Sequence, residues 1–313
     1  MRVLVTGAGG FVGGFLLPHL LQAGHEVVAT SLEVPERPDP QAVRWEAMDL
    51  IDAQRVHRCV TSVKPEGVIH LAAQASVGGS WEDPAGTYRS NIEGTSNLLE
   101  ALKRLGPRVV LVGSAQQYAR VPEGKPLKES DPLAAGSPYA LSKIAQEQMG
   151  RMYLDRYGVQ TVFTRSFNHT GPGQSPEYAI GSFASQIARL ERSGGGEMQV
   201  GNLDSRRDFL DVRDVIGAYG MLLERGEPGE AYNVCSGVAV RMGDVLDKLL
   251  EISGLTDKVE VHPQIRHVSD DSDLLVGDST KISKAIGWSP QIPLDRSLLE
   301  TLDWYRSALE GRQ

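Results

Sequence analysis

The first half of the chain alternates short apolar runs with longer segments in which apolar and polar residues mix. The runs are brief and rich in Val, Leu and Ile, as is typical of strands buried on both faces. They lie at 3–6, 27–30, 43–45, 68–71, 109–112 and 161–164. Strands that alternate with amphipathic segments predict a parallel sheet with helices on both sides.

The longer segments carry helix signals. Residues 11–23 follow a glycine cluster and end at Gly24, and residues 139–157 end at Gly158. Residues 87–105 place Ile92, Leu98 and Leu102 at spacings that share a helical face, and stop before a Gly-Pro pair. Glycine directly after the last periodic residue is a common helix end, so each segment is predicted to be one helix.

The pattern loosens after Arg165. Loops rich in Gly, Pro and polar residues are expected at 168–176 and 193–197, and helices at 242–253 and 294–309. Residues 212–235 again read as helix plus strand. We therefore predict an α/β fold with a Rossmann-type, doubly wound parallel sheet and a smaller, interleaved α/β C-terminal cap domain. The sheet domain takes 1–165 and about 212–235, and the cap takes 166–211 and 236–313.

Composition narrows the function classes. The chain has 32 basic and 40 acidic residues and a net charge of −8, which argues against binding to nucleic acid or an anionic membrane. Cys59 and Cys235 form neither a disulfide framework nor a Cys/His cluster, so no metal site is predicted. The N-terminus shows no secretion signal and no apolar run is long enough to span a membrane. We expect a cytoplasmic protein.

Residues 6–13 read Thr-Gly-Ala-Gly-Gly-Phe-Val-Gly, directly after the first predicted strand and before a helix. Glycines at this spacing permit a tight turn and let backbone approach a pyrophosphate at the helix N-terminus. The strand before and the helix after are the context that this motif needs. The predicted cofactor contacts in this loop are Gly7, Gly10, Phe11, Val12 and Gly13.

The end of the second predicted strand bears on the choice of cofactor. An NAD site usually carries an acid here for the ribose hydroxyls, whereas this chain has Thr30 and Ser31. Small hydroxyls leave room for a 2′-phosphate, with Arg37 as a partner, although Glu33 could serve NAD. We expect NADP or NAD, with NADP favoured and Ser31 in contact.

Asp49 and Leu50 follow the third predicted strand, where a carboxylate could meet the adenine edge. The alternative is that Asp49 caps a helix that begins at Ile51.

Tyr139 and Lys143 are four residues apart and share a helical face. Tyrosine exchanges protons near neutral pH only if its pKa falls well below about 10, and a neighbouring ammonium favours the phenolate. We therefore expect Lys143 to lower the pKa of Tyr139. Ser114 ends the fifth strand at the ligand-facing edge of a parallel sheet. Ser114, Tyr139 and Lys143 are the predicted catalytic residues; a chance pair on a helix surface is the alternative.

The glycine motif, Ser114, Tyr139 and Lys143 together resemble the extended short-chain dehydrogenase/reductase family, over nearly the whole chain. Segments 70–73, 91–95 and 207–214 are similar to further landmarks of that family. The resemblance implies an NAD(P)-dependent oxidoreductase acting on a nucleotide-diphosphate sugar. It also implies a homodimer held by a four-helix bundle formed from 87–105 and 139–157. Its further cofactor contacts would be Leu71, Ala72, Ala73 and Asn91.

Residues 165–174, Arg-Ser-Phe-Asn-His-Thr-Gly-Pro-Gly-Gln, resemble the GDP-mannose branch of the family. That branch holds GDP-mannose 4,6-dehydratases and GDP-4-keto-6-deoxy-D-mannose reductases, and the Gly-Pro-Gly-Gln ending is more similar to the reductases. The resemblance implies reduction of the 4-keto group of GDP-4-keto-6-deoxy-D-mannose to GDP-D-rhamnose, a step of deoxysugar biosynthesis. The predicted substrate contacts are Gln74, Ser76, Gln116, Asn168, Arg207 and Arg266.

Two of these contacts rest on charge. The Arg207 guanidinium matches phosphate oxygens, although an ion pair with Asp208 or Asp211 is the alternative. The arginine usual in the family near the C-terminus falls on Val268 here, and Arg266 is the nearby substitute. This departure leaves the nucleotide base open.

Chemistry separates the reductase from its rivals. Elimination of water needs an acid and a base, and the dehydratases place a glutamate three residues beyond the serine, where this chain has Gln117. Glutamine cannot exchange a proton at neutral pH. A 4-epimerase with tightly bound NAD would use the same Ser, Tyr and Lys and stays open. A non-catalytic nucleotide-binding regulator is expected to lack the Tyr or the Lys. His70 and His169 are expected to be packed or hydrogen-bonded.

Overall fold

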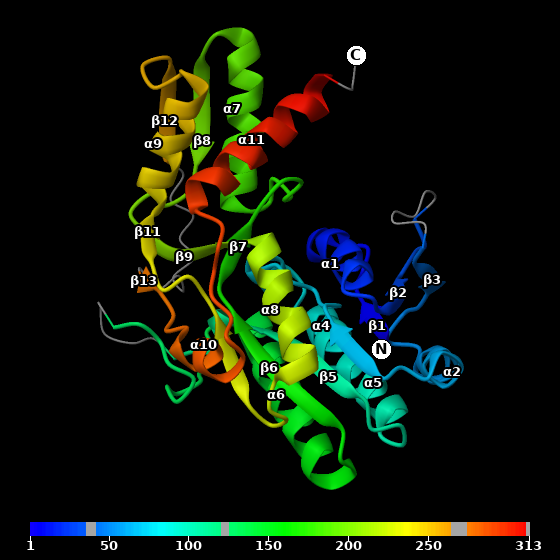
Figure 1. The fold of residues 1–313 in the computed structure, drawn as a ribbon. Helices are drawn as coiled ribbons and strands as arrows, with labels where there is room; N and C mark the ends of the chain where they lie inside the picture. Colours follow the sequence, from blue (N-terminus) through cyan, green and yellow to red (C-terminus); the bar gives the residue numbers. More distant parts are fainter. Residues whose placement is uncertain (36–41, 120–124, 264–273, 311–313) are drawn as a thin grey trace.

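The computed structural model describes residues 1–35, 42–119, 125–263 and 274–310. Its main sheet is parallel and seven-stranded, in the order β10-β6-β5-β4-β1-β2-β3 (Figure 1). Every predicted strand lies in this sheet, and the predicted fold class is confirmed. The strands are β1 (Arg2–Thr6), β2 (Glu26–Ser31), β3 (Arg44–Ala47), β4 (Gly67–His70), β5 (Arg108–Ser114), β6 (Gln160–Ser166) and β10 (Ala231–Val234).

Helices cover both faces of the sheet because successive strand residues point to opposite sides. Val3 and Val5 of β1 pack in one core with α1 (Phe11–Gln22), α8 (Val212–Arg225) and α10 (Thr280–Ile286). Leu4 packs in a second core with α2 (Ala53–Val63) and α5 (Gly94–Leu102), and α6 (Pro138–Tyr157) lies on the same side. The apolar runs of the sequence are therefore strands whose side chains are buried on both faces of the sheet.

The predicted helix at 87–105 is wrong in detail. Two short helices, α3 (Val77–Glu82) and α4 (Pro84–Tyr88), are followed by a π-helical turn at Arg89–Glu93 and then by α5. The turn carries the Asn91 side chain, which bonds to the backbone of Gln74 in the segment after β4. A π-turn inserts an extra residue into a helix and often occurs at functional sites.

The C-terminal part builds smaller sheets. β9 (Arg206–Asp211) pairs with β7 (Asn168–Thr170), β11 (Ala239–Arg241) and β13 (Leu274–Leu275). A separate ribbon joins β8 (Gly196–Val200) to β12 (Val259–Pro263), so β8 begins inside the loop predicted at 193–197. A third core packs α7 (Ala179–Ser193), α9 (Met242–Ser253) and α11 (Leu294–Glu310) against the ribbon. These elements gather at one end of the molecule (Figure 1).

The chain returns to the main sheet through α8 and β10, which come after β9 in sequence. This path supports the predicted interleaving, and the exact domain boundaries stay predictions. Within the described residues, no helix has the length and apolar character needed to cross a bilayer.

Close packing of α6 on the sheet gives the first testable prediction. A Cβ on Gly150 would lie 2.4 Å from Phe163 Cε1 and 2.6 Å from Leu111 Cδ1. Gly150→Ala should therefore destabilise the fold by about 1–3 kcal/mol, since overpacking outweighs the gain in helix propensity. Urea unfolding followed by circular dichroism measures the change.

The matched control is Gly217→Ala in α8, where a Cβ would meet nothing within 4 Å. This variant should gain up to about 1 kcal/mol. Equal stabilisation of both variants would contradict the packing argument.

Candidate active site

The turn between β1 and α1 brings backbone segments unusually close. Gly7 has a φ of +71°, and a Cβ there would lie 2.6 Å from Ala72 Cα. A Cβ on Gly13 would lie 2.1 Å from the Ala8 carbonyl oxygen. Gly10 caps α1 with no side chain bonded to the first-turn amides, and that turn has no acidic residue. This cradle fits a dinucleotide pyrophosphate, because helix N-terminal amides attract phosphate oxygens.

The other predicted cofactor contacts border this turn. The Ser31 Cβ would lie 3.3 Å from a Cβ on Gly9, and Ser31 donates to the Glu33 carbonyl. The Leu71 amide donates to the Thr6 carbonyl at 3.1 Å, which aligns the Leu71–Ala73 segment beside the loop. Arg37 lies outside the described residues.

Asp49 does not cap a helix that starts at Ile51. Its Oδ1 accepts from the Ile51 amide at 2.9 Å, but α2 begins at Ala53, and Asp52 caps it by accepting from Arg55. The alternative cap role is therefore wrong. Leu50 packs against α5, since a Cβ added to Gly94 would lie 3.0 Å from the Leu50 Cβ.

The three predicted catalytic residues come together at the carboxyl end of β5. Ser114 is the last residue of β5, and its hydroxyl hydrogen-bonds the phenol of Tyr139. Tyr139 lies in the first turn of α6, which Ser137 caps by accepting from the Ala140 amide. Lys143 follows one turn later and is buried.

The predicted effect of Lys143 on Tyr139 is wrong for the protein alone. Burial raises the pKa of Tyr139 to about 12, although the Ser114 hydrogen bond opposes the rise. The Lys143 Nζ lies 6.0 Å from the Tyr139 ring centroid and instead donates to the Val112 carbonyl at 2.7 Å. Burial lowers the pKa of Lys143 to about 7. Tyr139 is therefore a protonated phenol at neutral pH, ready to donate.

Asn91 ties the segment after β4 to α6. Its side-chain oxygen Oδ1 accepts from the Gln74 backbone N–H at 2.7 Å, and its Nδ2 donates to the Gln74 carbonyl at 3.0 Å. It also donates to Ser142 Oγ at 2.9 Å, and Ser142 donates to the Tyr139 carbonyl at 2.7 Å. The side-chain amide of Asn91, a predicted cofactor contact, is therefore bonded within the protein and holds α6 in place.

His70 extends this buried network to the glycine turn. Its Nε2 lies 2.9 Å from Thr95 Oγ1, which donates its own proton to the Asn91 carbonyl. The Nε2 must therefore carry the proton, and Nδ1 accepts from Thr6 Oγ1 at 2.7 Å. Burial lowers the pKa of His70 to about 3. His70 is a hydrogen-bonded structural residue, as expected.

The predicted substrate contacts are placed unevenly. Gln74 Oε1 is buried without a hydrogen-bond partner, so it is free to meet a ligand. Ser76 Oγ instead caps α3 by accepting from the Gly79 amide at 3.0 Å. Gln116 is partly exposed beside Ser114, and its backbone N–H donates to Ser114 Oγ at 3.2 Å. Arg266, together with Val268, lies outside the described residues.

Asn168 and Arg207 lie on the neighbouring strands β7 and β9. Asn168 faces Phe209 in the register of these strands. Arg207 is buried and donates to the Arg206 carbonyl at 2.9 Å. The carboxylate of Asp211 is held by Arg213, and that of Asp208 accepts from the Ser236 and Gly237 amides.

Gln117 points into the protein interior. It is fully buried; its Oε1 accepts from the Ser114 amide at 2.8 Å and its Nε2 donates to Glu147 at 3.1 Å. The prediction that position 117 would supply the dehydratase carboxylate is therefore wrong. The partly exposed residue of this turn is Gln116, which equally lacks a proton to exchange near neutral pH.

A ring contact joins the start of α1 to β7, which lies within the loop predicted at 168–176. The Phe11 and His169 rings are parallel within 4°, with centroids 6.4 Å apart. Burial lowers the pKa of His169, and its Nδ1 donates to the Phe167 carbonyl. Two segments that the sequence marked separately thus lie side by side.

The chain matches a family model described as GDP-mannose 4,6 dehydratase over residues 4–301. The chain belongs to this family. Its relatives include the GDP-6-deoxy-D-mannose reductase of Pseudomonas aeruginosa, 35% identical over 97% of both chains. A UDP-glucose 4-epimerase of Mycolicibacterium smegmatis is 32% identical over 98% of this chain and 99% of its own.

Solved structures of nucleotide-sugar enzymes share this fold. RMD from Pseudomonas aeruginosa in complex with NADPH is 34% identical, with a TM-score of 0.86 over 98% of this chain and 99% of its own. The UDP-glucose 4-epimerase of Thermus thermophilus with NAD is 32% identical, with a TM-score of 0.89 over 98% of this chain and 100% of its own. The predicted resemblance to extended short-chain dehydrogenases/reductases is confirmed, and the family is one of nucleotide-sugar enzymes.

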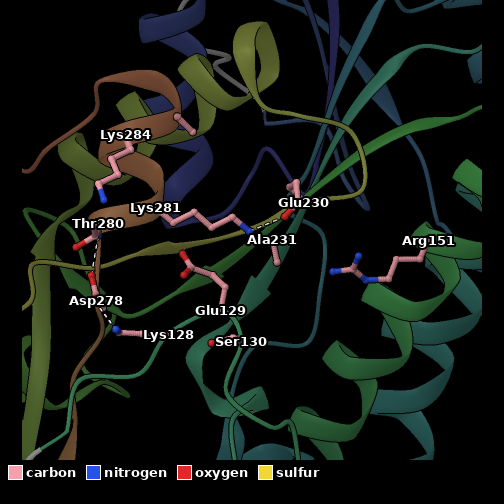
Figure 2. A pocket seen from close by; sticks show the side chains of 11 residues that line it. Lys128, Glu129, Ser130, Arg151, Glu230, Ala231, Asp278, Thr280, Lys281 and Lys284 are labelled. Atoms are coloured by element: carbon pink, nitrogen blue, oxygen red, sulfur yellow. Dashed lines mark hydrogen bonds and ion pairs between the residues drawn. The ribbon is translucent and has the colours of Figure 1, made fainter.

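A cavity of about 780 Å³ lies at the β10 edge of the sheet (Figure 2). None of the predicted site residues lines it. Its ion pairs include Lys281 with Glu230 at 2.6 Å and Lys128 with Asp278 at 4.0 Å.

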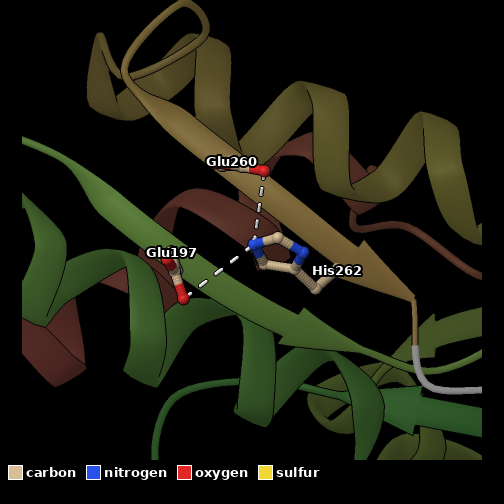
Figure 3. Close-up of side chains that lie close together, drawn as sticks. All are labelled: Glu197, Glu260 and His262. Atoms are coloured by element: carbon tan, nitrogen blue, oxygen red, sulfur yellow. Dashed lines mark ion pairs between the residues drawn. The ribbon is translucent and has the colours of Figure 1, made fainter.

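A surface cluster on the β8–β12 ribbon holds His262 between two carboxylates (Figure 3). The Nε2 of His262 lies 3.9 Å from Glu197 and 3.6 Å from Glu260, which face each other in the strand register. Like charges opposite each other destabilise a strand pair, and the imidazole between them offsets this when protonated. The prediction of no metal site stays a prediction.

Several residues that build the site were not singled out in the sequence. Gln146 accepts from Lys143 Nζ at 3.0 Å, and Glu147 anchors Gln117. Gln146 lies three residues after Lys143 and Glu147 lies four, so both share the helical face of Tyr139 and Lys143. That spacing was the available signal.

His70 gives a pH prediction. An unfolded histidine titrates near 6.5 and the folded one near 3, so the unfolded state binds more protons between these values. The contribution of His70 to stability is therefore full above pH 6.5 and is lost as the pH falls toward 3. The slope from this group is up to about 1.4 kcal/mol per pH unit.

We expect His70→Gln to be less stable at neutral pH, since it disturbs the buried network, but to lose less stability on acidification than the wild type. Urea unfolding at a series of pH values measures both slopes. His57→Gln, an exposed change on α2, should keep the wild-type slope. Identical slopes for His70→Gln and wild type would contradict the assignment.

Proposed function

We propose that the protein is an NAD(P)H-dependent reductase of the 4-keto group of a nucleotide-activated 6-deoxyhexose, with GDP-4-keto-6-deoxy-D-mannose as substrate and GDP-D-rhamnose as product. The observation that carries the proposal is the placement of a buried Tyr139, in the first turn of α6, beside Ser114 at the carboxyl end of β5. The adjacent turn offers Gln116 and Gln117, and neither can act as an acid or base for elimination. A 35% identical relative is a GDP-6-deoxy-D-mannose reductase.

The reduction adds a hydride to carbon 4 and a proton to its oxygen. The reduced nicotinamide supplies the hydride when it is bound. Tyr139 donates the proton, and the Ser114 hydroxyl orients the carbonyl and stabilises the charge that develops on its oxygen. Lys143, with a pKa of about 7, holds the cofactor ribose and can exchange a proton near neutral pH. Gln74 and Asn168 are the proposed sugar and diphosphate contacts, together with Arg207.

The preferred cofactor is NADP in this proposal. β2 ends in Thr30 and Ser31, so hydroxyl side chains stand where an NAD site usually carries an acid. A structural neighbour with 34% identity binds NADPH, whereas the epimerase neighbour binds NAD.

A 4-epimerase is the second candidate, because epimerases match the chain at 32% identity. Its first step removes a proton from a sugar hydroxyl, so it requires a base. An epimerase would use the same Ser114, Tyr139 and Lys143, so the assays below separate the two reactions.

We also propose a homodimer through α6 and the 84–102 segment. Leu141 and Met152 are 44% and 65% exposed and lie eleven positions apart along α6, so they share one helical face. The exposed Gln148 lies between them on that face. A second copy of this chain is the proposed partner for this apolar face, which the family resemblance also implies.

The reductase is tested by mixing the purified protein with GDP-4-keto-6-deoxy-D-mannose and NADPH or NADH, and following loss of absorbance from the reduced nicotinamide. We expect one cofactor oxidised per deoxyhexose formed, with NADPH the better substrate, and GDP-rhamnose identified by NMR. Tyr139→Phe should lower kcat by at least about a hundredfold with nearly unchanged cofactor binding, since only the proton donor is lost.

Parallel reactions with UDP-glucose and with GDP-mannose test the rivals. Turnover of either, without oxidation of added NADPH in the first assay, would overturn the reductase. A Tyr139→Phe variant that loses cofactor binding as well would show that Tyr139 is structural.

The dimer is tested with Met152→Glu, which places one carboxylate from each copy at the interface. Because buried charges without partners are costly, this variant should be a monomer in light scattering after gel filtration. Val238→Glu is the matched control, since Val238 is 60% exposed in the turn before β11. A wild-type monomer, or a Met152→Glu dimer, would contradict the proposed face.

A further inference from the structure

A buried ion cluster lies directly behind Ser114. Glu147 of α6 accepts from Arg165 Nε at 3.1 Å and from Arg165 Nη2 at 2.9 Å, a two-pronged contact. Arg151 Nη2 donates to the same carboxylate at 2.9 Å. Burial opposes the charge of Glu147, but the two guanidinium groups hold its pKa below the usual range. The carboxylate is therefore ionised and accepts hydrogen bonds only.

Gln117 links this cluster to Ser114. Its Nε2 donates to Glu147 Oε2 at 3.1 Å, and its Oε1 accepts from the Ser114 amide at 2.8 Å. Because the carboxylate can only accept, the NH₂ end of the amide must face Glu147 and the oxygen must face Ser114. Gly113 leaves the space, since a Cβ there would lie 2.4 Å from Gln117 Oε1.

The link has consequences for the catalytic hydroxyl. Ser114 carries the hydroxyl that bonds Tyr139, and its backbone amide is held by Gln117. Tyr139, Lys143 and Glu147 are spaced four residues apart on one face of α6, so the same helix supplies the proton donor and the anchor. The distance between the Ser114 and Tyr139 hydroxyls thus depends on a shared rigid element.

We propose that Glu147 and Arg165 are positioning residues that hold Ser114 in its catalytic geometry through the Gln117 amide. The inference deepens the proposed function, because it rests on the assignment of Ser114 to the carbonyl. Arg165 is fixed further by donating to the Glu129 carbonyl at 3.0 Å and by lying 4.9 Å from the Tyr118 ring centroid.

The outer end of the cluster opens on the cavity of Figure 2, whose wall includes Arg151 and Glu129. The Arg151 side chain is 36% exposed and that of Arg165 is 5% exposed. Water screens the outer pair, so Arg165 is the stronger partner of Glu147. Arg151→Gln should therefore lower kcat less than any change that breaks the Gln117 link.

The decisive variant is Gln117→Glu, which keeps the size and the oxygen that accepts from Ser114. The charged groups around position 117 are Glu147, Lys143 and Arg151 of α6, and Arg165 of β6. A protonated Glu at 117 can donate to Glu147 as the amide does. An ionised one repels it, because two carboxylates cannot share this contact.

We therefore expect the kcat of Gln117→Glu, as a ratio to wild type at the same pH, to approach one near about pH 6. It should fall about 10- to 100-fold by about pH 8.5, since small misplacements of reacting groups cost this much. Gln117→Leu, which cannot make either bond, should lose kcat at all pH values. The KM for the sugar should change little in both variants, because Gln117 is buried behind the site.

The matched control is Gln54→Glu, the same chemical change at an exposed position of α2, which should keep the wild-type pH profile. Thermal melting at each pH shows whether the variants stay folded. A folded Gln117→Glu variant with wild-type kcat at high pH, or a fall in kcat that follows the melting temperature, would overturn the proposal.

Hydrogen exchange separates this inference from the proposed function, because it needs no substrate. Mass spectrometry of the 113–118 segment should show faster exchange of the Ser114 amide in Gln117→Leu than in wild type. A wild type that fails to turn over the 4-keto sugar would end the reductase proposal alone. Unchanged exchange in folded Gln117→Leu would overturn the positioning role.

Discussion

Burial of charged and polar side chains along α6 is the constraint on which the site depends. The face of this helix that meets the sheet carries Tyr139, Lys143, Gln146 and Glu147, all of them buried. A buried charge without partners costs several kcal/mol, so each group must find a donor or acceptor in the sheet. Lys143 finds the Val112 carbonyl, and Glu147 finds Arg165. These bonds fix the helix against β5 and β6, where Tyr139 meets Ser114.

The same burial sets the chemistry. A phenol in a low-dielectric site keeps its proton, so Tyr139 is prepared to donate to an oxygen that gains negative charge. An ammonium in the same surroundings is weakened, and Lys143 titrates near neutral pH. Carbonyl reduction needs the first property and profits from the second. Elimination would need a carboxylate that this turn does not supply, because both of its long polar side chains are amides.

Polar contacts also join parts of the chain that are distant in sequence. Thr6, His70 and Thr95 connect the glycine turn to Asn91, and through Ser142 to the carbonyl of Tyr139. One chain of hydrogen bonds therefore holds both the glycine turn and Tyr139, and each donor in it has an acceptor. Phe11 also stacks on His169 and connects β7 to the same turn.

Local patterns determined much of this protein. Strands buried on both faces need continuous apolar runs, so β1, β2, β4 and β5 could be predicted, and a glycine turn with a Tyr/Lys pair marked the site. Tertiary structure decided the rest, because the deciding interactions join residues distant in sequence. The π-turn at Asn91 depends on Gln74, the role of Gln117 on Glu147 and Arg165, and the direction of the Tyr139 pKa on how deeply α6 is buried. Spacing along one helix reveals which side chains share a face, but only packing decides which charges lose water and which partners replace it.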